Sequence, residues 1–449
     1  MHSDLTTAPI PRLVRRLAIP AGTGLFFNTM FNVVDTWYGG RLSTAALAAM
    51  SLSFPVFFII LSVGTGISSG ATALIGNALG RGEREEARHF VLQVISFALL
   101  HAIGLTLFGL ASSSWFFRLM GAQGEYLTLA VSYMDVIFCG SIFFLFNFVM
   151  SAILNSHGDT ISYRNFLIGG FLLNLLLDPW FMYGGLGIPA LGLPGVALST
   201  IAIQFLGNFY LFGRLKQAGA VTDFDLRELI PRCRFFRELF GQGFPSAMNM
   251  FSIAAGIFII TWFVGRFGRD AVAAYGIGTR IEQIALLPVM GLNVATMALT
   301  AQNYGAERID RIRQTLSTAL RYGVMIASAG TLAALLFSRE LLRLFTSDAG
   351  VISAGAGFLR VEALVFPAYV LLYVCISAMQ GIKRPGFGLW IGLYRQIVAP
   401  PLMFHLLTVT LGWGINGIWW GIFLVTWSAA AIVVLFVTRL LKRLEEDLT

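Results

Sequence analysis

Asp35 and Asp178 are acidic residues within long apolar stretches of the sequence. A charged group at such a position costs about 2.5 to 3.5 kcal/mol on membrane-insertion scales. Asn174 precedes Asp178 by one helical turn, so both side chains project from the same helix face, and Ser199 and Thr200 lie early in the next apolar stretch. Two neighbouring carboxylates raise each other's proton affinity, and amide and hydroxyl oxygens also suit a hard cation. These residues predict a site for H+ or Na+, with Na+ held by Asp35, Asn174, Asp178 and Thr200.

Three more acids, Asp135, Glu282 and Glu362, lie in apolar stretches and are weaker candidates. A single acid such as Asp135 could simply bind a nearby serine or backbone group. The two glutamates could pair with Arg280 and Arg360 as ion pairs at helix ends.

The composition requires a bilayer around these residues. Of the 449 residues, 57% are hydrophobic and only 12% are charged, and the mean hydropathy is +0.76. A soluble chain carries about 25% charged residues, so this one cannot cover its apolar surface with a polar shell. The sequence therefore predicts an all-α membrane protein in contact with lipid.

Apolar windows separated by charged or Gly/Pro breaks predict twelve transmembrane helices. Their approximate ranges are 13–38, 45–78, 87–114, 123–155, 160–184, 189–213, 238–265, 270–303, 310–337, 351–381, 386–410 and 415–438.

The basic residues predict the orientation. When all 31 Lys and Arg are sorted by loop, 23 fall on the side that holds both termini. Because positive residues stay cytoplasmic, both termini should face the cytosol of a cell with an inner membrane. We expect an N-lobe at 1–213, a cytoplasmic linker at 214–237 and a C-lobe at 238–449.

A shift of 225 positions reveals an internal repeat. DTWYGGRLSTAALAAM at 35–50 aligns without a gap with ITWFVGRFGRDAVAAY at 260–275, and SAILN at 151–155 matches SAMQG at 377–381 at a shift of 226. A six-helix unit therefore occurs twice. Since six is even, both copies insert with the same orientation, which is typical of transporters with a central cavity between two bundles.

The repeat also bears on Asp35, because its counterpart in the second copy is Ile260. A buried polar network that only fixes helix packing is the alternative to a cation site, but packing alone should have kept the acid in both copies. Pro20 lies early in the same helix and deletes one backbone hydrogen bond, so it predicts either a static kink or a moving hinge.

The sequence lacks the signs of several other functions. None of the three lysines precedes Ser or Thr, so a Walker phosphate loop is absent. The three cysteines and five histidines show no metal-like spacing, and the scattered basic residues do not indicate nucleic-acid binding. We therefore expect no enzyme activity and no cofactor beyond a coupling ion.

NVVDTWYGG in the first span, NLLLD in the fifth, GVALST in the sixth and PVMGLNVATMALTAQNYGA in the eighth resemble the multidrug and toxic compound extrusion (MATE) family. The resemblance implies a V-shaped pair of six-helix lobes that exports amphipathic, often cationic, compounds in exchange for inward H+ or Na+. By motif, Asp35, Asn174, Asp178 and Thr200 match the family's N-lobe cation site, with Ser199 adjacent to Thr200. The expected partners are small-molecule substrates and membrane lipid, and we expect a monomer.

One departure from the family bears on the ion. A branch described as sodium-coupled carries acids in spans seven and ten, whereas span seven here, FPSAMNMFSIAAGIFIITWF, has none. The resemblance therefore favours the DinF-like branch and H+. A lipid-linked precursor flippase of the same superfamily is the alternative, but such proteins tend to carry basic residues in the cavity. An intramembrane enzyme acting on lipid-linked sugars would need acidic catalytic loops on one face, but the outer loops between spans five and six and between spans eleven and twelve carry no charge.

Overall fold

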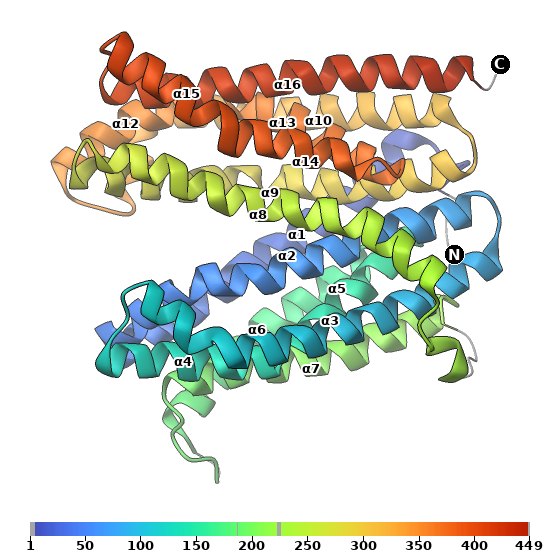
Figure 1. Cartoon of the computed structure of the whole chain (residues 1–449), viewed down its shortest axis with the longest axis horizontal. Helices are drawn as coiled ribbons and strands as arrows, with labels where there is room; N and C mark the ends of the chain where they lie inside the picture. Colours follow the sequence, from blue (N-terminus) through green and yellow to red (C-terminus); the bar gives the residue numbers. More distant parts are fainter. Residues whose placement is uncertain (1–4, 186, 222–225, 448–449) are drawn as a thin grey trace. The chain divides into compact units, whose positions relative to one another are not determined.

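The computed structural model describes residues 5–185, 187–221 and 226–447. Every named element among them is a helix, apart from one isolated bridge between Gly185 and Ile188. Packing divides the described chain into two compact units (Figure 1). Unit 1 holds residues 23–247, and unit 2 holds residues 5–22 and 248–447.

Most of unit 1 comes from the first repeat. Its helices are most of α1 (Ile10–Leu42), α2 (Thr44–Gly80), α3 (Arg84–Leu119), α4 (Gly124–Cys139), α5 (Ser141–Ser156), α6 (Ile161–Tyr183), α7 (Leu193–Gln217), η1 (Leu226–Leu229) and the beginning of α8 (Cys233–Gly265).

Unit 2 contains the remaining helices together with the first part of α1. They are the rest of α8, α9 (Arg269–Gly305), α10 (Ile309–Leu336), α11 (Ser338–Arg343), α12 (Ala349–Ala363), α13 (Phe366–Gly381), α14 (Pro385–Leu393), η2 (Tyr394–Val398), α15 (Ala399–His405), η3 (Leu406–Thr410) and α16 (Ile415–Glu446).

The predicted all-α membrane fold is confirmed. Nine of the described helices are long and apolar enough to cross a membrane. The pairs α4–α5 and α12–α13 are long and apolar enough only when taken together, with bends of 48° and 49°, which gives up to eleven spans if each pair is one. The predicted span 386–410 consists of α14, α15 and the π-helical turns η2 and η3, joined end to end. Large apolar side chains such as Phe258, at 73% exposure, and Trp390, at 71%, face outward, as contact with lipid requires.

The helices α1 and α8 each contribute to both units. The division falls between Gly22 and Thr23 in α1 and between Ala247 and Met248 in α8, two positions that lie 225 residues apart. The predicted lobes at 1–213 and 238–449 follow the repeat. In the packing units, by contrast, the first part of α1 belongs to unit 2 and the first part of α8 belongs to unit 1. The lobe boundaries stay a prediction about the repeat.

Close helix crossings hold the exchanged segments. In unit 2, a Cβ on Gly291 of α9 would lie 2.4 Å from the carbonyl oxygen of Ala18. In unit 1, a Cβ on Gly66 of α2 would lie 2.7 Å from the carbonyl oxygen of Gly243. Both glycines are needed because the backbones approach this closely. The two crossings are related by the same shift of 225.

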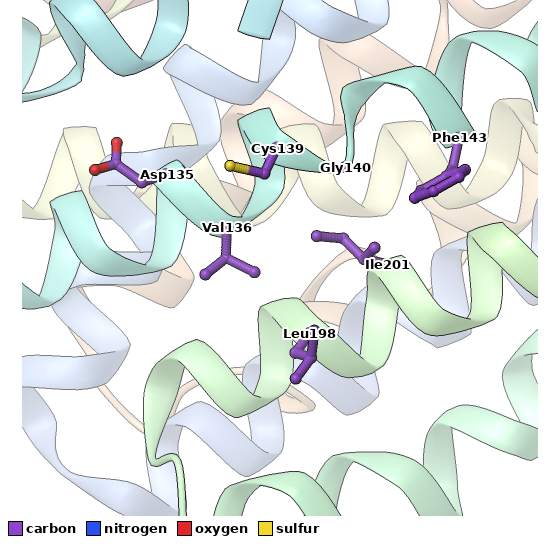
Figure 2. A pocket seen from close by; sticks show the side chains of 7 residues that line it. All are labelled: Asp135, Val136, Cys139, Gly140, Phe143, Leu198 and Ile201. Atoms are coloured by element: carbon purple, nitrogen blue, oxygen red, sulfur yellow. The ribbon is translucent and has the colours of Figure 1, made fainter.

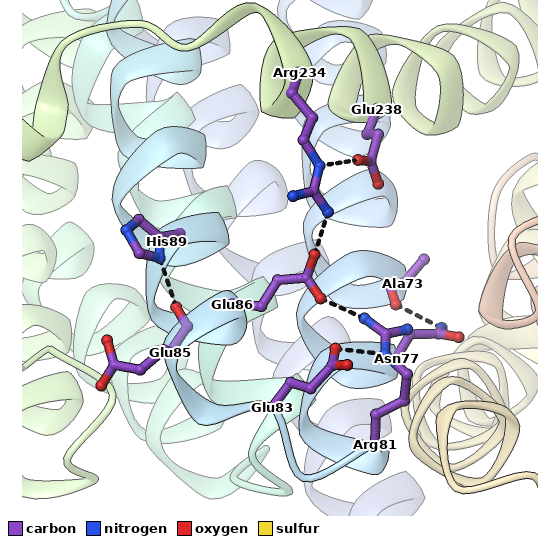
Figure 3. Close-up of polar contacts among 9 residues, drawn as sticks. All are labelled: Ala73, Asn77, Arg81, Glu83, Glu85, Glu86, His89, Arg234 and Glu238. Atoms are coloured by element: carbon purple, nitrogen blue, oxygen red, sulfur yellow. Dashed lines mark hydrogen bonds and ion pairs between the residues drawn. The ribbon is translucent and has the colours of Figure 1, made fainter.

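Polar contacts anchor the start of each exchanged segment. In unit 2, the Arg311 side chain donates to Asn303 Oδ1 at 2.8 Å and to the Ala8 carbonyl at 2.7 Å. In unit 1, Glu86 accepts hydrogen bonds from Arg81 and from Arg234 at the start of α8 (Figure 3). Each segment is therefore held by side chains as well as by apolar packing.

The predicted linker at 214–237 is part of unit 1, apart from residues 222–225, which lie outside the described residues. Arg88 of α3 forms an ion pair with Glu228. Gln93 donates to the carbonyls of Glu228 and Ile230 and accepts from the Arg232 amide at 2.8 Å. The described part of the linker is therefore docked on α3.

Candidate functional site

Asp35 is the buried acid on α1, and two side chains donate to it. Asn174 Nδ2 lies 2.8 Å from Asp35 Oδ1, and Thr200 Oγ1 lies 3.3 Å from Asp35 Oδ2. The Thr200 hydroxyl has one hydrogen and also lies 3.1 Å from the Val196 carbonyl, so it divides its donor between two acceptors. The structure therefore brings three of the predicted residues, from α1, α6 and α7, into direct contact.

Asp178 completes the acid pair from α6. It is fully buried and lies close enough to Asp35 for the two charges to interact directly. Both of its carboxylate oxygens lack a hydrogen-bond partner in the described part of the chain, as do Asn174 Oδ1 and Ser199 Oγ. Among the described residues, no basic side chain pairs with either aspartate. Four buried oxygens at this site therefore lack a partner among the described residues, two of them on Asp178 itself and two on its neighbours Asn174 and Ser199.

Pro179 explains how α6 is tied to α1 at this level. Proline has no backbone N–H, so the carbonyl of Leu175, four residues earlier, loses its helical donor. The Tyr38 hydroxyl of α1 donates to that carbonyl at 3.3 Å. Pro179, which follows Asp178, thus leaves the Leu175 carbonyl free to accept a hydrogen bond. Tyr38, three residues after Asp35, donates that hydrogen bond.

The register of α7 is set by two glycines at its start. Gly192 precedes the helix with φ of 63°, a conformation that favours glycine. A Cβ on Gly195 would lie 2.5 Å from the Phe181 carbonyl oxygen of α6. This close approach fixes the first turn of α7 against the end of α6 and places Ser199 and Thr200 beside the acid pair.

Tyr133 of α4 is a member of the site that sequence reasoning missed. Its ring lies near both Asp35 and Asp178. Tyrosine is common at membrane interfaces and in cores, so nothing in the local sequence distinguished it. Tyr133 and Asp135 lie about half a helical turn apart, so their side chains point in roughly opposite directions. This spacing could have indicated that one of these two side chains faces Asp35 and Asp178.

Asp135 lies elsewhere. It accepts a hydrogen bond of 2.6 Å from the Ser113 hydroxyl of α3, in agreement with the predicted serine alternative. Since residues two apart on a helix point about 200° apart, Asp135 faces away from the acid pair that Tyr133 approaches.

Glu282 and Glu362 belong to a second group, in unit 2, and the predicted pairing with Arg280 and Arg360 is wrong. In the described structure neither arginine forms an ion pair with these glutamates; both arginines are exposed. Instead, the Tyr369 hydroxyl donates to Glu362 Oε1 at 3.0 Å. The two glutamates lie close enough to each other to interact.

Arg395 supplies the positive charge of this second group. Its guanidinium lies 5.4 Å from the Tyr369 ring centre and 5.9 Å from that of Tyr373, and it is near both glutamates. The count of 23 basic residues on the side of the termini included Arg395, which is wrong, because Arg395 lies in the π-helical turn η2 inside the predicted span 386–410. Its apolar neighbours could have shown that it is not in a loop.

Pro20 lies within a helix that stays continuous from Ile10 to Leu42. It is two residues before the point where α1 passes from unit 2 into unit 1. Pro245 has the same position in α8, at a shift of 225, two residues before that helix changes unit. The structure does not test whether either proline moves.

Known proteins similar to this chain agree with the repeat and the fold. The MatE family model matches residues 20–180 and again residues 245–404, two matches that begin 225 positions apart. A protein named FAD transporter from Shewanella oneidensis is 28% identical over 401 residues, covering 88% of this chain and 87% of that protein. A probable multidrug resistance protein NorM from Thermotoga maritima is 28% identical over 82% of this chain and 78% of its own length.

Solved structures cover almost the whole chain. A MOP superfamily transporter from Pyrococcus furiosus has a TM-score of 0.92 at 24% identity and covers 98% of both chains. An outward-facing multidrug resistance MATE family transporter has a TM-score of 0.90 at 25% identity, with the same coverage. Together with the family match over both repeats, these likenesses show that the chain is a multi-pass membrane protein and belongs to the MATE family of transporters.

Proposed function

We propose that this chain is a secondary antiporter that exports amphipathic, often cationic compounds and is driven by inward movement of H+ at Asp35 and Asp178. The observation that carries the proposal is a pair of neighbouring buried carboxylates in which both oxygens of Asp178, and the nearby Asn174 Oδ1 and Ser199 Oγ, have no hydrogen-bond partner among the described residues. Such a group is costly unless a cation or proton joins it. Relatives named multidrug resistance protein NorM and multidrug export protein MepA support the cargo class.

The choice of H+ over Na+ follows from the donors around the pair. Asn174 Nδ2 and Thr200 Oγ1 already point hydrogens at Asp35, so a metal ion there would meet positive ends of dipoles. Asp178 receives no hydrogen bond of good geometry from the described residues, although the Ser199 hydroxyl lies near it. A proton on Asp178 would provide a donor and remove the repulsion between the two carboxylates.

Alternating access would then follow from the charge state of the pair. Protonation removes one buried charge, and a conformation that buries the pair more deeply becomes more populated. Export of a cationic compound would be coupled to this change without an enzyme step or a bound cofactor. We place the protein in the cell (inner) membrane as a monomer with both termini in the cytoplasm.

The test uses purified protein in proteoliposomes, with pH and sodium gradients imposed separately. We expect export of a fluorescent cation such as ethidium under a pH gradient without sodium. A rate that ignores the pH gradient and rises only with a sodium gradient would assign the site to Na+. Loss of both responses would remove the antiport proposal.

A second candidate cargo is a flavin dinucleotide. The relative named FAD transporter matches 88% of this chain, and unit 2 contains a guanidinium beside two tyrosine rings, Arg395 with Tyr369 and Tyr373. Arginine and tyrosine can recognise phosphates and flat rings. The same liposomes, loaded with FAD, distinguish the two cargoes. The lipid-linked flippase alternative lacks a comparable supporting relative among those described above.

A further inference from the structure

A groove lies on unit 1 where the fourth span bends between α4 and α5. Its volume is about 390 Å³, and Asp135, Val136, Cys139, Gly140 and Phe143 line one side (Figure 2). Leu198 and Ile201 of α7 line the other. Apart from Asp135 the lining is apolar or small, and all of these residues belong to predicted membrane spans.

The bend that forms the groove is held by specific contacts. A Cβ on Gly140 would lie 2.4 Å from the Ile201 side chain, so only glycine allows this approach to α7. The Thr106 hydroxyl of α3 donates to the Phe138 carbonyl at 2.8 Å, and Ser141 donates to the Ala102 carbonyl at 3.2 Å. Side chains of α3 and α5 thus provide the hydrogen bonds that support the broken helix.

Asp135 is the only charged residue among the groove's lining residues. Its Oδ1 accepts from Ser113, and among the described residues its other oxygen has no hydrogen bond and no basic side chain forms an ion pair with it. A carboxylate in this position is stabilised by a cation from outside the protein. The groove therefore offers negative charge at one end and apolar surface along the rest.

The groove is separate from the acid pair. Tyr133 approaches Asp35 and Asp178, and Asp135 points about 200° away on the same helix. On α7, Leu198 points similarly away from Thr200, which bonds Asp35. A ligand in the groove would therefore lie on the other side of α4 and α7 from the coupling residues.

We propose that this groove binds a lipophilic monocation, with its charge at Asp135 and its apolar body extending toward Phe143. Phe143 follows Asp135 by eight residues across the bend between α4 and α5, so the groove takes a body of at most roughly 12 Å. The volume lies within the range of small-molecule sites. In this role the groove collects cationic cargo from the bilayer before transport. The inference rests on the proposed function only in taking the cargo to be cationic.

The chain's own cysteines provide the test. Cys139 lines the groove and is exposed, Cys233 at the start of α8 is exposed but outside the groove, and Cys375 is buried. In phosphatidylcholine proteoliposomes, a membrane-permeant maleimide is added with increasing tetraphenylphosphonium, and labelling of each cysteine is followed by mass spectrometry. We expect tetraphenylphosphonium to slow labelling of Cys139 at least several-fold and to leave Cys233 unchanged.

Charge is tested with a matched compound and matched variants. Tetraphenylborate has the same size and the opposite charge, and it should not protect Cys139. Asp135→Asn should abolish protection by the cation, whereas Asp135→Glu should keep it. Leu198→Trp should fill the groove and slow labelling with no ligand present. Asp35→Asn should retain protection, so failure of coupled transport and failure of the groove give different results.

Three outcomes would overturn the proposal. Equal protection by tetraphenylphosphonium and tetraphenylborate would show an apolar slot for lipid chains. Protection that survives Asp135→Asn would show that the cation acts from another site through a conformational change. Absence of protection in the unaltered chain would show that no cation binds there. If Asp135→Asn is not monodisperse after purification, the two probe ions and Leu198→Trp still decide.

Discussion

The two units use the same repeat to hold charge in opposite ways. In unit 1, Asp35 and Asp178 face each other, and the described residues provide no basic partner and too few donors. In unit 2, the counterpart of Asp35 is Ile260, which packs in an apolar cluster with Phe404 and Ile422. The repeat fold therefore forms without acids at this level, and the pair in unit 1 is retained at a cost in stability.

Unit 2 also contains two acids close to each other, but these have a basic side chain nearby. Glu282 and Glu362 lie near Arg395, whose guanidinium contacts two stacked tyrosine rings 5.7 Å apart. Breaking a buried ion pair is destabilising, while the intact pair contributes little net stability. The comparison teaches that an acid pair without a basic neighbour fits the proposed ion coupling, whereas acids beside a guanidinium fit a role in architecture or in the proposed recognition of cargo.

The largest expected effect comes from removing Asp35, the acid that has no acidic counterpart in unit 2. Asp35→Asn should reduce proton-driven export to background, because the amide cannot take up a proton at this position. The protein should remain folded and in the membrane, since Ile260 fills the equivalent place in unit 2. Export is measured in proteoliposomes under a pH gradient, with Ile260→Asn as the matched variant. Export at wild-type rates by Asp35→Asn would contradict the comparison.

Removing the compensation in unit 2 should be the next largest effect. Arg395→Met leaves Glu282 and Glu362 without a positive partner and should cost about 2 kcal/mol of stability, less than for a fully buried pair because Arg395 is half-buried. Thermal unfolding in detergent measures the loss. Adding Glu362→Gln should restore part of it, since the double variant has one less uncompensated charge. Additive losses would show that the two side chains do not interact.

A third effect concerns the paired prolines. Pro20→Ala restores a backbone donor at the point where α1 changes unit, and it should reduce export several-fold without removing the ion site. Pro245→Ala makes the same change in α8, and equal effects would indicate that both helices bend during transport. Spectroscopic distance probes on residues 20–38 at low and high pH report the bending directly. A single arrangement across that pH range would assign coupling to motion elsewhere.

The sequence predicted much of this molecule because some signals are local. Apolar length revealed the spans, and a gapless shift of 225 revealed the repeat. Depth within a span grouped Asp35, Asn174, Asp178 and Thr200, which the structure brings together. Tyr133 and Arg395 were missed because their roles depend on which helix lies opposite, and a single sequence does not specify those neighbours.

The sequence also could not predict that the first part of α1 packs in unit 2 and the first part of α8 in unit 1, because this too depends on which helices lie opposite each other. Pro20 and Pro245 were readable as a repeated pair, but the packing of residues 5–22 with α9 depends on how helices cross. The sequence does not show which helix approaches Gly66 or Gly291. The partners, Gly243 and Ala18, became visible only in the structure.

The last test asks whether these two crossings are equivalent. Gly291→Ala and Gly66→Ala each place a methyl group against a carbonyl oxygen, at 2.4 and 2.7 Å, and each should cost about 1 to 3 kcal/mol of stability. Gly104→Ala in α3 and Gly276→Ala in α9 are matched controls, because a Cβ at either meets nothing within 4 Å. The controls should be neutral or slightly stabilising, since alanine favours helix more than glycine does.

Backbone atoms move less easily than the ends of side chains, so neither crossing should accommodate the methyl group. The shorter distance at Gly291 should make the loss of stability larger for Gly291→Ala than for Gly66→Ala. Equal stability of all four variants would show that neither crossing is closely packed, and the exchanged segments would then be held mainly by the Arg311 and Glu86 contacts.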